Sequence, residues 1–74
     1  MNKHIDLVKK WLDDPESVTQ KELKANAKAA WAARAESNRA AATNAAAWAA
    51  IDAYDQDPAY AARWVKRYEE LTDE

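Results

Sequence analysis

Few residues in this sequence combine types and spacings that could do chemistry. The single histidine, His4, has no second histidine and no cysteine with which to build a usual zinc site. Asp52, Asp55 and Asp57 form an acidic cluster, but calcium loops need a tight turn that usually contains glycine, and the chain has no glycine. The same absence excludes phosphate-binding loops. We therefore expect no metal, no cofactor and no enzymatic activity, and interpret His4 as a structural residue and the aspartates as a helix end followed by an N-cap.

Basic residues gather on one side of a helical wheel at Lys21, Lys24, Lys28 and Arg39. A face of this kind is usually solvated, and it lacks the charge density of a nucleic-acid-binding surface. The net charge of −2 is unevenly spread: the first forty residues carry eight Lys/Arg and six Asp/Glu, and the rest carry three and seven. Nucleic acid is therefore not an expected partner.

Large aromatic residues set among alanines are the best candidates for recognition. Trp31 and Trp48 stand in an alanine-rich segment, residues 21–54, in which 16 of the 34 residues are alanine. They either pack beneath neighbouring helices or stand exposed as anchors, because tryptophan is enriched among the residues that dominate binding energy. On a helical wheel Arg34 and Asp52 fall on the alanine–tryptophan side, so each of these charges must reach water, pair or meet a partner. The candidate protein-binding residues are Trp31, Arg34, Trp48, Asp52, Tyr60 and Trp64.

The elements that must position these residues are helices. Apolar residues recur with helical periodicity between residues 3 and 13, which predicts an amphipathic first helix. Asn2 is suited to cap its start, and Pro15 ends it, because the residue before proline avoids the helical region. The residues of its buried arc are Ile5, Val8, Trp11 and Leu12.

A second, alanine-rich helix is predicted from about residue 20 to residue 55. Alanine has the highest helix propensity, and Thr19 and Glu22 form a capping box at the start. Serine, asparagine and threonine weaken the stretch from Ser37 to Asn44, so a kink or break there is the alternative. We favour one continuous helix, because no glycine or proline interrupts this segment.

A third helix is predicted over about residues 58–71. Asp57 is a good N-cap, and Pro58 is favoured at the first helical position. The expected fold class is all-α: one domain, residues 1–74, with a long central helix and a shorter helix packed back on it at each end, a three-helix arrangement. Part of the long helix remains uncovered in this arrangement. The stripe predicted to face the long helix contains Tyr60, Trp64, Tyr68 and Leu71, with Ala61 and Val65 beside it.

No apolar run long enough for a signal peptide or a membrane span occurs in the chain. We therefore expect no membrane partner and a cytoplasmic protein.

The arrangement of these segments resembles a class of viral proteins. Residues 5–12 read IDLVKKWL and residues 14–20 read DPESVTQ; alanine punctuated by tryptophan and tyrosine follows, and residues 63–71 read RWVKRYEEL. In this the chain is similar to small alanine-rich proteins encoded by tailed bacteriophages. The resemblance implies an accessory protein made during infection, which binds and blocks a host or defence protein in the host cytoplasm.

Two functional hypotheses follow. The first is a small non-enzymatic helical module that binds another protein, acting as a phage-encoded inhibitor of a host or anti-phage defence protein. The alternative is structural self-assembly, in which the alanine face pairs with its own copy to give a homodimer or a larger bundle.

Overall fold

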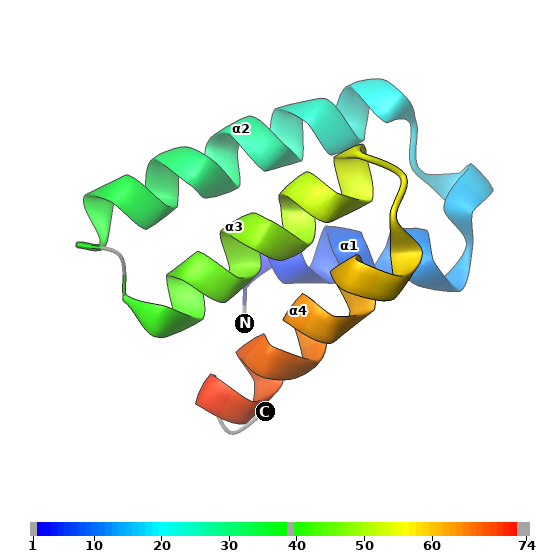
Figure 1. The fold of residues 1–74 in the computed structure, drawn as a ribbon. Helices are drawn as coiled ribbons and strands as arrows, with labels where there is room; N and C mark the ends of the chain where they lie inside the picture. Colours follow the sequence, from blue (N-terminus) through cyan, green and yellow to red (C-terminus); the bar gives the residue numbers. More distant parts are fainter. Residues whose placement is uncertain (1, 39, 73–74) are drawn as a thin grey trace.

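The computed structural model describes residues 2–38 and 40–72, and within these ranges the chain is helical with no strand. These described residues form four α-helices in succession, with one 3₁₀ turn, η1 (Pro15–Ser17), after the first (Figure 1). The first helix occupies the range predicted from its periodicity. The helices are α1 (Lys3–Asp13), α2 (Gln20–Glu36), α3 (Ala41–Tyr54) and α4 (Pro58–Thr72).

The predicted long central helix is wrong, because it divides into α2 and α3 at the weak stretch after Glu36. Asn38 adopts the left-handed conformation, with φ of 59°. Asparagine tolerates this conformation better than most residues, and so ends a helix where no glycine is present. The Ser37 hydroxyl donates to the carbonyl of Arg34 at 3.0 Å, which satisfies one of the carbonyls left free at the helix end.

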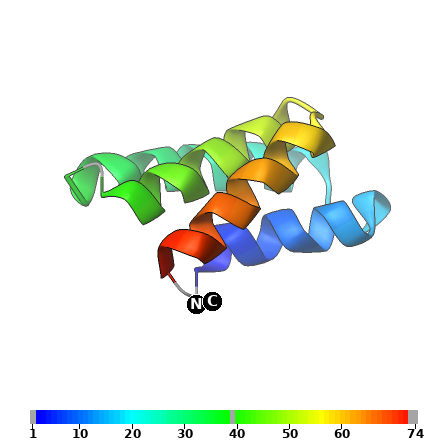
Figure 2. The ribbon, with the colours of Figure 1, turned by 60° about the horizontal axis from the view of Figure 1, so that its bottom comes forward.

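Folding α2 back onto α3 covers apolar surface that a straight helix would leave in water. α2, α3 and α4 form a layer with α3 in the middle, and α1 lies behind this layer (Figure 1). Figure 2 shows α1 beneath the layer in that view, and α1 contacts all three of the other helices. The expectation that each short helix covers one half of a long helix is therefore replaced by a bundle centred on α3.

Small side chains make this central position possible. Six alanines of α3 are buried, and methyl side chains let neighbouring helices approach closely. The larger buried side chains come from the helices around α3, and the bulkiest of those fully enclosed are Ile5, Val8 and Leu23. The six buried alanines are Ala45, Ala46, Ala47, Ala49, Ala50 and Ala53.

The buried face of α4 is turned relative to the predicted stripe. Ala61, Val65 and Tyr68 are buried, whereas Tyr60 and Leu71 are exposed. The prediction was wrong for these last two residues, because α4 places the methyl group of Ala61 against the core where a larger side chain would hold the helix away.

Side-chain hydrogen bonds join distant parts of the chain. His4 is only 8% exposed; its Nδ1 donates to Oδ1 of Asn26 at 2.9 Å, and Nδ2 of Asn26 donates to the His4 carbonyl at 3.2 Å. The structural interpretation of His4 therefore holds, with Asn26 as its partner. At the start of α2, Nε2 of Gln20 donates to the carbonyl of Tyr54 at 3.0 Å.

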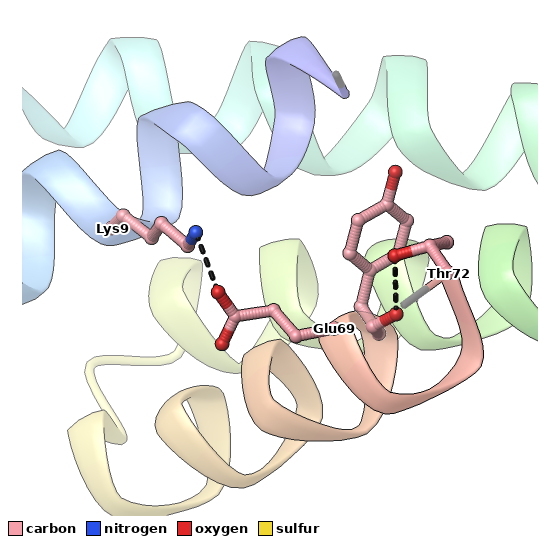
Figure 3. A network of polar contacts seen from close by, with 4 residues as sticks. Lys9, Glu69 and Thr72 are labelled. Carbon is pink, nitrogen blue, oxygen red and sulfur yellow. Dashed lines mark hydrogen bonds and ion pairs between the residues drawn. The ribbon is translucent and has the colours of Figure 1, made fainter. Parts of the chain in front are cut away.

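An ion pair links α1 to α4. Nζ of Lys9 lies 2.7 Å from Oε2 of Glu69 (Figure 3). One turn later, the Thr72 hydroxyl donates to the carbonyl of Tyr68 at 2.9 Å, within α4. Glu69 is thus directed toward α1.

The predicted capping box at the start of α2 is present. The Glu22 amide donates to the Thr19 hydroxyl at 3.1 Å, and the Glu22 carboxylate accepts from the Thr19 amide at 3.0 Å. The hydrogen bonds from the Thr19 backbone and hydroxyl hold the pKa of Glu22 below its ordinary value.

Across the described part of the chain, no helix combines the length and the apolar character needed to cross a membrane.

Candidate functional site

Three tryptophans, each from a different helix, meet in a row. The rings of Trp31 on α2 and Trp48 on α3 are 5.4 Å apart between centroids and nearly perpendicular, at 85°. Trp48 in turn stacks on Trp64 of α4, with centroids 6.4 Å apart and an angle of 23°. Both arrangements are favourable for aromatic pairs. We call Trp31, Trp48 and Trp64 the tryptophan row.

The break between α2 and α3 is what assembles this row. Trp31 and Trp48 are seventeen residues apart, so on one continuous helix they point about 100° away from each other. On the antiparallel pair formed by α2 and α3, they face each other across the contact between the two helices.

Much of the row is open to solvent. Trp31 is 41% exposed and Trp48 is 36% exposed, while Trp64 is half-buried. From residue 42 to residue 54 all residues of α3 except Trp48 are buried or half-buried, so Trp48 is the position where the middle helix reaches the surface. A single exposed aromatic residue is ordinary, but rings in contact across three helices make a contiguous apolar patch. The rings of Trp31 and Trp48 therefore pack against each other while both remain partly exposed.

An arginine covers one end of the row. The guanidinium carbon of Arg34 lies 4.4 Å from the centroid of the Trp31 ring, a cation–π arrangement. Its Nε donates to Oδ1 of Asn44 on α3 at 2.6 Å. Arg34 therefore pairs, which is one of the outcomes expected for a charge on the alanine–tryptophan side. Sequence reasoning missed Asn44 as its partner, because the two residues become neighbours only when the chain turns between them.

The other end of the row continues along α4. Tyr60 is 54% exposed, and the guanidinium carbon of Arg63 lies 5.5 Å from its ring centroid. Beside Trp64 the surface is hollowed into an open depression of about 560 Å³. The residues that line this hollow, called the α4 hollow below, are Tyr60, Arg63, Trp64, Lys66, Arg67 and Glu70.

Asp52 lies one turn after Trp48 on α3, in acidic surroundings. Burial, followed by the charges of Asp57 and Asp55, raises the pKa of its carboxyl. Asp57 also caps α4, since its Oδ1 accepts from the Tyr60 amide at 3.2 Å. The structure therefore brings Asp52 together with the acidic end of α3, while the other five candidate residues follow the row and its extension on α4.

The remaining polar groups do not converge. Lys21, Lys24 and Lys28 are all exposed on α2, and Arg39 lies outside the described residues. Over residues 2–38 and 40–72, no group of three or more His, Asp or Glu side chains is placed to hold a metal ion. What the surface offers is a set of indole rings edged by guanidinium groups, an arrangement suited to binding.

Comparison of the sequence with protein families and curated proteins, and of the chain with solved structures, finds no match.

Proposed function

We propose that this protein is a small helical protein-binding module, a bacteriophage-type accessory protein that inhibits a host or anti-phage defence protein by occupying a surface on it. The observation that carries the proposal is the exposed tryptophan row, with Arg34 stacked at one end and Tyr60 at the other. Tryptophan, tyrosine and arginine are the residues most enriched among those that dominate binding energy at protein interfaces.

The packing beneath the row supports this proposal. Trp48 projects from a helix in which six alanines are buried, and the edge-to-face and stacked contacts hold its ring from both sides. A ring held in this way loses little conformational freedom when a partner covers it, so more of its burial energy is available for affinity.

The proposed activity is non-enzymatic occupation of a partner. Indole rings and guanidinium groups bind and orient, and the row itself contains no pairing of a nucleophile with a base. The phage origin and the blocking of a host or defence protein in the host cytoplasm come from the resemblance of the sequence.

Less alanine surface is exposed for self-assembly than the sequence alone implied. The six alanines of α3 pack inside the chain, against the other three helices. A second copy would instead meet the tryptophan row itself or the exposed alanines of α2, which are Ala25, Ala29, Ala32 and Ala35. Light scattering over a wide concentration range separates the two hypotheses: a monomer leaves the row for a different protein, and a stable dimer favours self-assembly.

The proposal is tested by capturing partners from bacterial extract with the tagged chain and with Trp48→Ala. We expect the wild-type chain to retain a protein that Trp48→Ala binds more weakly by about thirtyfold, as the loss of a dominant interface residue requires. Lys28→Ala, an exposed change on α2, is the matched control and should bind as the wild type does.

Far-UV circular dichroism of each variant completes the test. Retained helicity in Trp48→Ala, together with lost binding, supports a contact role. Loss of helicity in step with binding would show that Trp48 is needed for the fold, and equal capture by both chains would remove the row from the interface.

A further inference from the structure

The α4 hollow gathers the positive charge of an otherwise acidic half of the chain. Residues 41–74 contain only three Lys/Arg against seven Asp/Glu. All three of these cations, Arg63, Lys66 and Arg67, line the one hollow. Positions three and four apart share one helix face, so these three cations together make that face attractive to a ligand of opposite charge.

The described acidic residues of this half lie mostly elsewhere. Asp52, Asp55 and Asp57 surround the turn between α3 and α4. Glu69 is directed toward α1 by its ion pair with Lys9 (Figure 3). Among the described acidic residues only Glu70 lines the hollow, so its described lining carries three positive charges and one negative charge.

The hollow is also continuous with apolar surface. Trp64 lines the hollow and stacks on Trp48, so it belongs both to the hollow and to the tryptophan row. Tyr60, more than half exposed, forms part of the same wall beneath Arg63. A ligand that fills this site meets guanidinium groups and aromatic rings together.

Two chemistries bind such a surface: acidic protein segments with apolar side chains, and single-stranded nucleic acid. Nucleic acid needs cations spaced along a track to follow its phosphates. Here the cations are concentrated at one place, beside Glu70, in a half of the chain with a net excess of four negative charges. Charge complementarity therefore favours a compact acidic protein segment.

We infer that the partner presents an acidic segment to this protein, with a carboxylate held between Arg63 and Arg67 in the α4 hollow and an apolar side chain packed on Trp64. Arginine binds carboxylates through paired N–H donors, which adds direction to the attraction. This inference rests on the proposed function and names the chemistry of the partner.

The test measures binding of a short fluorescein-labelled peptide of alternating glutamate and leucine by fluorescence anisotropy. We expect it to bind the wild-type chain, and to bind Arg63→Glu/Arg67→Glu at least about tenfold more weakly. The matched control is Lys24→Glu/Lys28→Glu, which makes the same charge change at the same spacing on exposed positions of α2. This control should bind the peptide nearly as the wild type does.

Two further probes define the ligand chemistry. A peptide with glutamine in place of glutamate should bind more weakly, and binding of the acidic peptide should fall as salt is added. Arg63→Gln/Arg67→Gln provides a milder pair of changes should charge reversal reduce helicity. The inference would be overturned if Arg63→Glu/Arg67→Glu bound the acidic peptide as well as Lys24→Glu/Lys28→Glu does. It would also be overturned if the wild type did not bind the acidic peptide.

Binding of oligothymidylate tests the second chemistry, which is single-stranded nucleic acid. Tight binding of this probe, lost in Arg63→Glu/Arg67→Glu, would mean that the hollow takes single-stranded nucleic acid and that the acidic-segment inference is wrong. Capture from extract then distinguishes the two proposals. If Trp48→Ala loses the captured partner but Arg63→Glu/Arg67→Glu retains it, the proposed function stands and this inference is wrong. If neither variant loses the partner, the proposed function and this inference are both wrong.

Discussion

Two regions that meet on α3 differ in the size of their side chains. On the inward side of this helix, six alanines are buried against α1, α2 and α4. On its outward side, Trp48 is exposed and touches Trp31 and Trp64. Globular proteins more often place their largest apolar side chains inside, so this arrangement reverses the usual order.

The difference shows how a short chain can both fold and retain a large aromatic surface. Alanine contributes little apolar area for each residue, but it lets helices pack closely along their length. Close packing therefore holds the bundle together with few bulky side chains, and three of the four tryptophans remain for the surface. The fourth, Trp11, is buried with α1 against the core.

The largest expected effect comes from breaking the small-residue interior. Ala50 is fully enclosed, at 0% exposure, so Ala50→Leu must displace neighbouring helices. We expect the free energy of unfolding, measured by urea denaturation, to fall by about 1–3 kcal/mol. Ala25→Leu, on the exposed side of α2, is the control and should change it by less than about 0.5 kcal/mol. Similar losses in both variants would show that close packing is not what separates the two regions.

A smaller effect is expected at the turn on which both regions depend. Asn38→Ala places an ordinary side chain at a φ of 59°, and we expect the free energy of unfolding to fall by about 1 kcal/mol. Asn38→Gly, which has no Cβ to strain, should be at least as stable as the wild type. A rise in molar mass for Asn38→Ala would contradict this expectation. It would mean that α2 and α3 have joined into one helix that pairs between chains.

The smallest effect is expected at Asp52, at the border of the two regions. Burial, Asp57 and Asp55 raise the pKa of Asp52 in the folded state above its ordinary value of 3.8. The folded protein then holds this proton more tightly than the unfolded chain does, so stability from Asp52 is present at acid pH and is lost as pH rises through the folded pKa. Asp52→Asn should therefore raise the melting temperature near neutral pH.

The pH dependence provides the control for this last prediction. Below the ordinary aspartate pKa, Asp52 is protonated in both states, and the advantage of Asp52→Asn should vanish. An advantage that persists unchanged in acid would mean that the substitution acts through packing and not through charge.

Signals between residues close in sequence predicted most of the helix boundaries. Three signals depend on residues a few positions apart: the stop at Pro15, the capping box at Thr19 and Glu22, and the Asp57–Pro58 start. A helix begins or ends close to each of them. The break at Asn38 was a weak site in the sequence, yet propensity favoured a continuous helix. Burying the alanines of α3 outweighed that propensity, and this gain exists only once the chain has turned back.

The candidate surface was likewise predictable only in part. Tryptophan among alanines, with arginine near by, marked Trp31, Arg34, Trp48 and Trp64 from residue type alone. Their contacts were not readable, because Trp31 meets Trp48 and Arg34 meets Asn44 across the turn. Composition and local spacing determined that the chain is helical and where most helices start and stop. Tertiary structure alone decided which alanines are enclosed and which aromatic rings gather at the surface, because both depend on contacts between residues far apart in the chain.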